Sequence, residues 1–176
     1  DASATISTLL SHSGNCAGKL VVTTAGTSRA FITKDLGGNK TDVWASGWFD
    51  VTEAGLAGND VPYLRFFDGA DRIVDVFRQN SGGGAWLRTA DGSGSWNYQD
   101  LHTPMPVDTT WHQVTLHVAP NGATSTIDVW IDGSPVYSST TFDLHTTVHL
   151  SMVQLGAEHV AQQMIEYFDD ITIGAS

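Results

Sequence analysis

The sequence has few groups that could stabilise it covalently or bind zinc. Only one of its 176 residues is a cysteine, Cys16, which excludes an intramolecular disulfide and a zinc site built from several cysteines. No stretch approaches the roughly 20 apolar residues that a transmembrane helix needs, and no basic segment precedes an apolar one at the start. Because helix-period segments are nearly absent as well, we expect a β protein that is stabilised by packing and does not insert into a membrane.

Positive charge is also scarce. Eight Lys and Arg stand against 19 Asp and Glu, and the formal net charge is −11. This balance argues against binding to nucleic acid or to an anionic membrane surface. The Asp excess has two interpretations, which composition does not separate: solubility, or oxygen ligands for a hard cation such as calcium.

The compartment and the domain organisation follow from the same composition. A surface low in Lys and rich in Asp, Gly, Ser and Thr favours a secreted or cell-surface protein, although the lack of disulfides weakens this argument. The sequence begins at Asp1 rather than Met, so we interpret it as a mature form or as a module of a longer, multidomain chain. It has no repeat of fixed period and no long linker, which predicts a single domain over residues 1–176.

Short β-rich runs bounded by turn residues recur along the whole chain. Outside a meander in the last third, they cover residues 19–24, 29–33, 43–51, 61–67, 72–78, 85–89, 148–155 and 165–173. Ten or more strands predict a sandwich or a barrel.

The meander spans residues 111–137. It contains two turn pairs, Asn121-Gly122 and Asp132-Gly133, between segments whose apolar residues alternate. Asn-Gly and Asp-Gly favour two-residue hairpin turns. Such turns predict that Leu116 lies opposite Ile127, and Val129 opposite Val136, on the core face.

The opposite face of this meander is predicted to point outward. It would carry Gln113 beside Trp130, then Thr115, Asp128 and Tyr137 in one row, and His117 beside Thr126. Aromatic faces bind sugars because a pyranose ring presents a patch of C–H groups. We therefore predict a ligand-binding surface, with packing under another segment as the alternative; its candidates are Trp130, Tyr137, Asp128, Gln113 and His117.

Four segments in the last two thirds resemble a known superfamily: TTWHQVTLHV, IDVWIDGSPVY, VHLSMVQLG and IEYFDDITIG. In this order they resemble the laminin G-like branch of the concanavalin A-like lectin/glucanase superfamily, over residues 61–174. The resemblance implies a jelly roll of two antiparallel sheets with glycans on the concave face or its rim loops. The chain lacks the cysteine pair common in animal modules, which favours a bacterial type.

A second group of candidates lies in AWLRTADGSGSWNYQD. Trp86, Arg88, Trp96 and Tyr98 are predicted to form a rim for ligand contact, because loop aromatics in a Gly/Ser-rich setting are often functional. The planar guanidinium of Arg88 would offer two parallel N–H donors to a uronate carboxylate or to paired hydroxyls. The alternative is that Trp96 folds back over the core. Further arginines at 65, 72 and 78 are compatible with acidic sugars or with ordinary ion pairs.

Two adjacent carboxylates, Asp169 and Asp170, occupy the closing strand. Successive strand residues point to opposite faces, so only one of them can face inward. A buried carboxylate needs a cation or an Arg partner. The superfamily resemblance adds calcium as a candidate structural ion with Asp170 or Asp169 as a ligand.

Hydrolase activity is not expected. Glycoside hydrolases need two carboxyl groups about 5 to 9.5 Å apart, the family's glucanases use paired Glu residues, and this chain has only Glu53, Glu158 and Glu166, in no such motif. A polysaccharide lyase, with Tyr98, His102 and Arg88 as its machinery, is a weaker alternative. We predict a non-catalytic carbohydrate-binding module, with a structural, adhesive or protein-interaction module as the runner-up.

Overall fold

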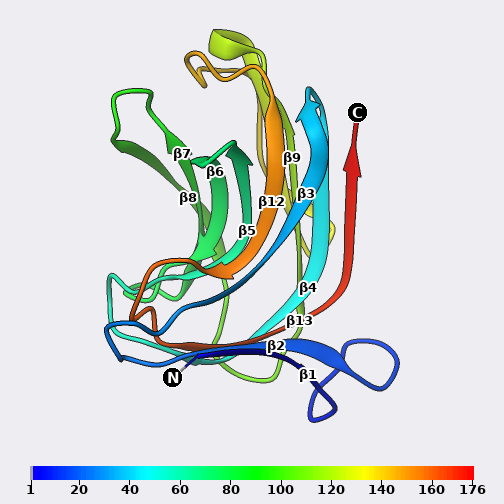
Figure 1. Ribbon diagram of the computed structural model, residues 1–176, viewed down its shortest axis with the longest axis vertical. Coiled ribbons are helices and arrows are strands. Elements are labelled where there is room, and N and C mark those ends of the chain that lie inside the picture. The colour runs from blue at the N-terminus through cyan, green and yellow to red at the C-terminus, as the bar shows by residue number, and fades with distance from the viewer. Residues whose placement is uncertain (1) are drawn as a thin grey trace.

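The computed structural model describes residues 2–176 and confirms an all-β sandwich of two antiparallel sheets (Figure 1). The seven-stranded sheet is made, in spatial order, of β1 (Ser3–Ser7), β2 (Ala17–Val22), β13 (Met164–Ala175), β4 (Val43–Ala54), β9 (His112–Ala119), β10 (Ser125–Ile131) and β11 (Ser134–Phe142). The six-stranded sheet is made of β3 (Ala30–Lys40), β12 (Leu150–Ala157), β5 (Val61–Asp68), β6 (Asp71–Arg78), β7 (Gly84–Ala90) and β8 (Trp96–Pro104).

The core lies between the two sheets and is built from alternate residues of their strands. Val114 and Leu116 of β9 and Val129 of β10 are fully buried, and Leu64 and Val76 contribute from the six-stranded sheet. Alternation places the remaining side chains of the same strands on the outer surfaces. Each sheet therefore has one core face and one face directed away from the sandwich.

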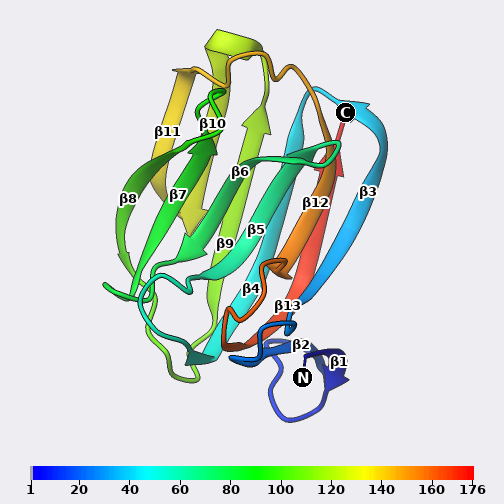
Figure 2. The ribbon, with the colours of Figure 1, turned by 60° about the vertical axis from the view of Figure 1, so that its left-hand side comes forward.

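The six-stranded sheet curves so that its outer surface is concave. In Figure 1 the concave surface opens toward the left, the side of β7 and β8, while β4 and β13 of the other sheet lie on the right, and Figure 2 shows the two layers from another side. The outer surface of the seven-stranded sheet faces the opposite way. Functional residues on the two sheets thus belong to separate surfaces, which we call the concave face and the outer face.

The hairpin between β9 and β10 differs from the predicted two-residue turn. Val118, not Leu116, lies opposite Ile127. Asn121 has a φ of −148°, whereas the predicted turn needs a positive φ, and Gly122 opens a short 3-10 helix, η1 (Gly122–Thr124). The N–H of Gly122 donates to the carbonyl of Thr147, so contacts with a distant loop replace the local turn. The shift of two residues keeps every side chain on its predicted face but changes its cross-strand neighbour.

The hairpin between β10 and β11 begins as predicted and then deviates. Asp132 and Gly133 both have positive φ, 51° and 75°, and Trp130 lies opposite Pro135. A bulge follows, so that Tyr137 rather than Val136 lies opposite Val129. Because the extra residue reverses the alternation, the prediction that Tyr137 points outward is wrong. Its ring packs against the core.

Two strands were missing from the sequence-based prediction, β1 and β8. β8 begins at Trp96, where a loop was expected to continue, and it forms an edge of the six-stranded sheet. Most of its residues are exposed or half-buried, so it lacks the apolar alternation by which strands are recognised. In the described part of the chain, residues 2–176, no helix is long and apolar enough to cross a membrane.

Candidate functional site

A row of polar side chains crosses the concave face. Gln154 of β12 lies opposite Arg65 of β5, Arg65 lies opposite Asp75 of β6, Asp75 opposite Arg88 of β7, and Arg88 opposite Tyr98 of β8. Residues directly opposite each other in antiparallel strands share a face. Five strands therefore direct these five side chains to the same surface.

Asp75 is the centre of an ion cluster in this row. It is fully buried and accepts hydrogen bonds from two nitrogens of Arg88, with the Nε bond at 3.0 Å. Arg72 and Arg65 approach Asp75 Oδ2 through their Nε atoms, at 3.4 and 3.6 Å. One carboxylate thus holds three guanidinium groups together.

Glu158 is the second anion of the cluster, at the end of β12. Its Oε1 accepts a hydrogen bond from Arg72 Nη1 at 3.2 Å and lies 3.6 Å from Arg65 Nη1. Gln154 Oε1 also accepts from Arg65 Nη1, at 3.3 Å. Three arginines against two carboxylates leave one unit of positive charge in the cluster, although the whole chain carries −11.

Several donors of this cluster are buried without a hydrogen-bond partner. They are Nε and Nη2 of Arg65 and Nε of Arg72. Burial lowers the pKa of Arg65 to about 10, while the nearby Asp75 opposes that shift. Arg65 therefore stays charged at neutral pH. A buried cation with unused N–H groups stabilises an anion placed beside it.

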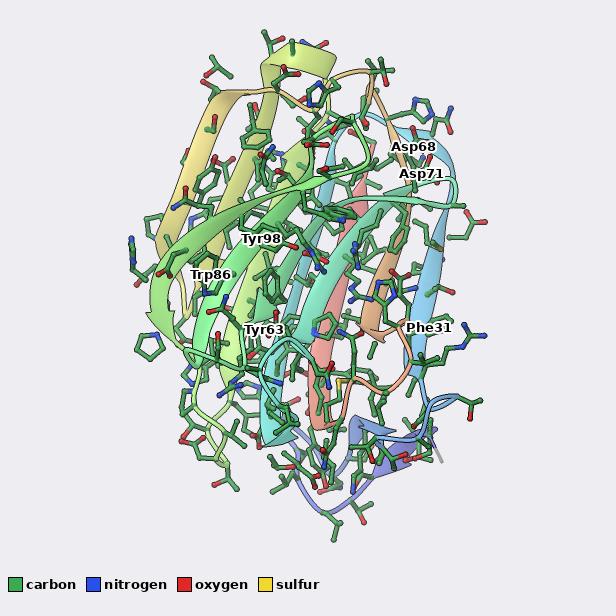
Figure 3. All side chains as sticks on the ribbon, turned by 90° about the vertical axis from the view of Figure 1, so that its left-hand side faces the viewer. Phe31, Tyr63, Asp68, Asp71, Trp86 and Tyr98 are labelled. Carbon is green, nitrogen blue, oxygen red and sulfur yellow. The ribbon has the colours of Figure 1, made fainter. Side chains whose placement is uncertain are left out.

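Aromatic rings cover the arginines. The guanidinium carbon of Arg72 lies 4.4 Å from the centroid of Trp96, and that of Arg88 lies 5.2 Å from the same ring and 5.9 Å from the ring of Tyr98. In the next row Trp86 lies opposite Phe77. Figure 3 looks onto the concave face and shows Tyr98 and Trp86 on one side of it and Phe31 on the other. Aromatic side chains therefore lie next to the arginines on the concave face.

A cavity of about 470 Å³ lies at one end of this face. Arg72, Trp96, Glu158 and His159 border it, together with the loops around residues 92–95 and 144–147. Asp71, labelled at the upper end of Figure 3, also lines it. The cavity thus extends from Arg72 and Glu158 of the arginine cluster to the polar loops around residues 92–95 and 144–147. A cleft with these polar groups could accommodate an extended polar ligand.

The structure brings one group of the predicted residues together and separates the other from it. Trp86, Arg88, Trp96 and Tyr98 lie on the concave face, as neighbours on β7 and β8. His102, considered with them, is exposed at the far end of β8 with positive φ. Arg65 and Arg72 join the cluster, whereas Arg78 turns away and donates to the carbonyl of Met105.

The other predicted group lies on the outer face of the seven-stranded sheet. Trp130 and Asp128 alternate with the core residues of β10, and Asp128 lies opposite His117. Because of the register shift, Trp130 lies opposite Thr115, and Gln113 lies opposite Trp48 of β4. These residues cannot share a ligand-binding surface with the arginine cluster, because the sandwich separates them.

Sequence reasoning missed three residues of the cluster: Asp75, Gln154 and Glu158. Asp75 stands within the apolar run IVDVF, and a carboxylate in a buried strand needs a cation. That signal could have paired it with an Arg on a neighbouring strand. Gln154 and Glu158 gave no such signal, because their partners are distant in sequence.

Asp169 and Asp170 anchor the loop between β1 and β2. Asp169 Oδ2 accepts hydrogen bonds from the backbone N–H groups of His12 and Ser13, both at 3.0 Å, and its Oδ1 accepts from the N–H of Asp170. Asp170 contacts His12 Nδ1 at 2.8 Å and accepts from Ser13 Oγ at 2.7 Å. Hydrogen bonds from Ser13 and His12 lower the pKa of Asp170.

All four oxygens of these two carboxylates are thus used by protein donors. Calcium takes six to eight oxygen ligands, and among residues 2–176 no group of three or more His, Cys, Asp or Glu side chains could hold a metal ion. In this arrangement both carboxylates serve as anchors for the loop between β1 and β2. Calcium binding at Asp169 or Asp170 stays a prediction.

Comparisons with known proteins establish the fold. No family model matches the sequence, and no curated protein matches it. Among solved structures, an endo-β-1,4-glucuronan lyase from the fungus Trichoderma reesei is similar, with a TM-score of 0.76 and 13% identity over 99% of this chain and 87% of that one. The cellulose-induced protein Cip1 has a TM-score of 0.74 and 17% identity over 99% and 86% of the two chains.

A third similar structure is domain 4 of AbnA, an extracellular arabinanase from Geobacillus stearothermophilus, solved in complex with arabinotriose. Its TM-score is 0.66, with 18% identity over 98% of this chain and 76% of that one. At such identities the likeness shows a shared jelly-roll sandwich and no more. The laminin G-like assignment stays a prediction.

Proposed function

We propose that this protein binds an acidic polysaccharide on its concave face. The observation that carries the proposal is a group of arginines and aromatic rings: Arg72 and Trp96 line the cleft, and Arg88 and Tyr98 lie beside them on the concave face. An indole or phenol ring offers a flat apolar surface to the C–H face of a sugar. A guanidinium beside it offers paired donors to a carboxylate.

The charge of the cluster supports uronates over neutral sugars. It holds one more cation than anion, and buried N–H groups of Arg65 and Arg72 have no hydrogen-bond partner. Arg65 itself is fully buried. It would therefore stabilise a bound carboxylate through its charge, while Arg72 and Arg88 make the contacts.

The similar structures give further support. Domain 4 of AbnA was solved with arabinotriose, and the Trichoderma reesei protein is named a glucuronan lyase. A polysaccharide ligand also agrees with the secreted or cell-surface location predicted from the composition. The predicted neighbouring domains of a longer chain would then bring a catalytic or anchoring domain close to the polymer.

We favour a protein that binds the polysaccharide without cleaving it. The two carboxylates of the arginine cluster, Asp75 and Glu158, are both engaged with arginines. A retaining hydrolase needs one free carboxylate nucleophile and one carboxylic acid with a raised pKa. Neither role fits a carboxylate that neutralises a guanidinium.

A polysaccharide lyase is the second candidate, because Tyr98 lies opposite Arg88. Arg88 would neutralise the uronate carboxylate, and the phenolate of Tyr98 would take the C5 proton. The C5–H electron pair would form the C4–C5 double bond as the C4–O4 bond breaks, and Tyr98 would return its proton to O4. His102 is too exposed to join this step.

Titration calorimetry with polygalacturonate, alginate and glucuronan oligosaccharides tests the proposal. We expect dissociation constants between about 1 mM and 1 μM, which correspond to about 4 to 8 kcal/mol, and weaker binding at higher salt. Arg88→Ala should weaken binding by about tenfold or more, because it removes charge-assisted hydrogen bonds. Trp96→Ala should weaken it through loss of the stacking surface.

The controls distinguish the candidates. Gln113→Ala on the outer face should leave uronate binding unchanged. Absorbance of an unsaturated product end that depends on Tyr98 would establish the lyase. Uronate binding that survives both Arg88→Ala and Trp96→Ala would show that the concave face is not the binding site. Absence of binding to every glycan would favour the structural or adhesive module.

A further inference from the structure

The outer face carries an exposed stack of aromatic rings that the concave site does not use. The indole of Trp44 lies parallel to the ring of His117, with centroids 4.1 Å apart, and parallel to the indole of Trp130, 5.2 Å away. Trp44 is 42% exposed and Trp130 is half-buried. The rings of Trp44, His117 and Trp130 thus form an apolar surface that solvent can reach, which we call the shelf.

The surroundings of Trp44 keep this shelf open. On the β9 side its cross-strand neighbour is His117, whereas on the β13 side it is Gly174. A side chain added at Gly174 would meet no atom within 4 Å. One flank of the indole is therefore uncovered because the neighbouring position has no side chain.

Carboxylates line the shelf. His117 Nδ1 lies 2.9 Å from Asp128 Oδ2, and His117 Nε2 lies 3.4 Å from Asp42 Oδ1. Ser138 Oγ donates to the other oxygen of Asp128 at 2.6 Å. The Asp42 side chain is 47% exposed. Each carboxylate has about four acceptor positions, so both retain capacity for donors from a ligand.

This chemistry is the reverse of that on the concave face. There, arginines lie beneath aromatic rings; here, both charged partners of His117 are carboxylates. Carboxylates accept hydrogen bonds from sugar hydroxyls and repel uronates. The aromatic shelf fits the C–H face of a pyranose ring. The ligand that matches both features is a neutral sugar.

Polar groups follow Trp44 along β4. Trp44, Ser46 and Trp48 point to the same side because they alternate with core residues. Ser46 and Thr115 form a hydroxyl pair at 2.8 Å. The ring of Trp48 stacks on His12 with centroids 3.9 Å apart, so its face is covered. The aromatic surface open to a sugar is therefore the part at Trp44, with hydroxyl groups beside it.

We propose that the outer face is a second glycan site that binds neutral polysaccharides through stacking on Trp44 and Trp130 and through hydroxyl donation to Asp42 and Asp128. The protein would then hold two polymers of different charge on opposite sides of one sandwich. This site is independent of the concave site, since the two share no residue.

Affinity electrophoresis in gels that contain neutral β-glucan, mannan or linear arabinan tests the proposal. We expect at least one of these polymers to retard the protein. Trp44→Ala should weaken that retardation by about tenfold, and Trp44→Phe should restore part of it because an aromatic face returns. Asp128→Asn should weaken it less, since an amide oxygen can still accept a hydrogen bond.

Arg88→Ala is the matched control, because it removes a concave contact and leaves the outer face intact. Retardation by a neutral polymer that is lost with Arg88→Ala and kept with Trp44→Ala would overturn the proposal. No retardation by any neutral polymer would overturn it too. Dimerisation in gel filtration that Trp44→Ala abolishes, without neutral glycan binding, would show that the face is a contact between copies of this chain. Thermal unfolding verifies that each variant is folded.

Discussion

The two sheets of this sandwich bury charge in different ways. In the six-stranded sheet Arg65 and Asp75 are both fully buried, and each has an ion-pair partner. In the seven-stranded sheet Asp50 and Glu166 are equally buried, and their carboxylate oxygens have no hydrogen-bond partner. Paired groups can keep their charge in the interior, whereas unpaired carboxylates are driven toward the neutral form.

The exposed surfaces of the two sheets also differ in the charge that lies beside their aromatic rings. The concave face presents guanidinium groups beside Trp96 and Tyr98. The outer face presents carboxylates beside Trp44 and Trp130. Both surfaces offer aromatic planes, and the sign of the neighbouring charge distinguishes the ligands that we propose for them. One sandwich can therefore expose two aromatic surfaces whose charged neighbours have opposite sign.

The largest effect is expected from Asp75→Asn. The substitution leaves three arginines around a neutral amide, and breaking a buried ion pair from one side costs about 3–5 kcal/mol. The free energy of unfolding in urea should fall by that amount. A loss below about 1 kcal/mol would contradict the view that this carboxylate holds the cluster together.

Asp128→Asn on the outer face is the matched control for that experiment. It removes the same charge from a part-buried contact with one imidazole and one hydroxyl, those of His117 and Ser138. A hydrogen bond contributes about 0.5–1.5 kcal/mol and the amide oxygen of Asn can still accept one, so the free energy of unfolding should fall by less than about 2 kcal/mol. Equal losses in the free energy of unfolding for Asp75→Asn and Asp128→Asn would contradict the difference that we describe between the two sheets.

A third prediction concerns pH and the unpaired carboxylates. Burial, reinforced by the charge of Asp108 and opposed by His112, raises the pKa of Asp50 to about 6. Burial also raises the pKa of Glu166 well above its ordinary value, although Arg65 opposes this shift. A carboxyl group with a raised pKa favours the folded state while it is protonated. Its contribution is complete below the pKa of the unfolded chain and is lost as pH rises through the folded-state value.

The wild-type protein should therefore lose stability as pH rises from about 4 to about 6, and the Asp50→Asn variant should lose less of it. We expect a gain on the order of 1 kcal/mol at pH 7.5 and little change near pH 4, because the amide cannot ionise. Urea unfolding at both pH values measures this difference. A variant that is destabilised equally at both would show that Asp50 has a partner in the folded protein.

Much of the fold could be predicted from local patterns. The alternation in β9 and β10 placed Trp130, Asp128 and His117 on the outer face despite a register shift of two residues. An even shift preserves the face of every side chain. The bulge in β11 was not predictable in the same way, because a single extra residue reversed Tyr137.

The candidate site was predictable only in part. Trp86, Arg88, Trp96 and Tyr98 are close in sequence, and their grouping followed from one strand and its neighbouring loop. Their relation to Trp130 could not be predicted, since no pattern within a strand states which sheet it joins. The prediction of a two-residue turn at Asn121 was wrong for a similar reason: the backbone N–H of Gly122 donates to Thr147, which lies beyond the next two strands.

The sequence by itself determined that this chain is built of many short strands in a sandwich or a barrel, because the period of two and the turn residues are local properties of the backbone, and the family resemblance favoured the sandwich. Only the tertiary structure decided that Arg65, Asp75, Arg88 and Gln154 meet in one row. Their pairing depends on the order of strands in the sheet. That order is set by how both sheets bury their apolar faces together, and charged residues far apart in sequence then become neighbours.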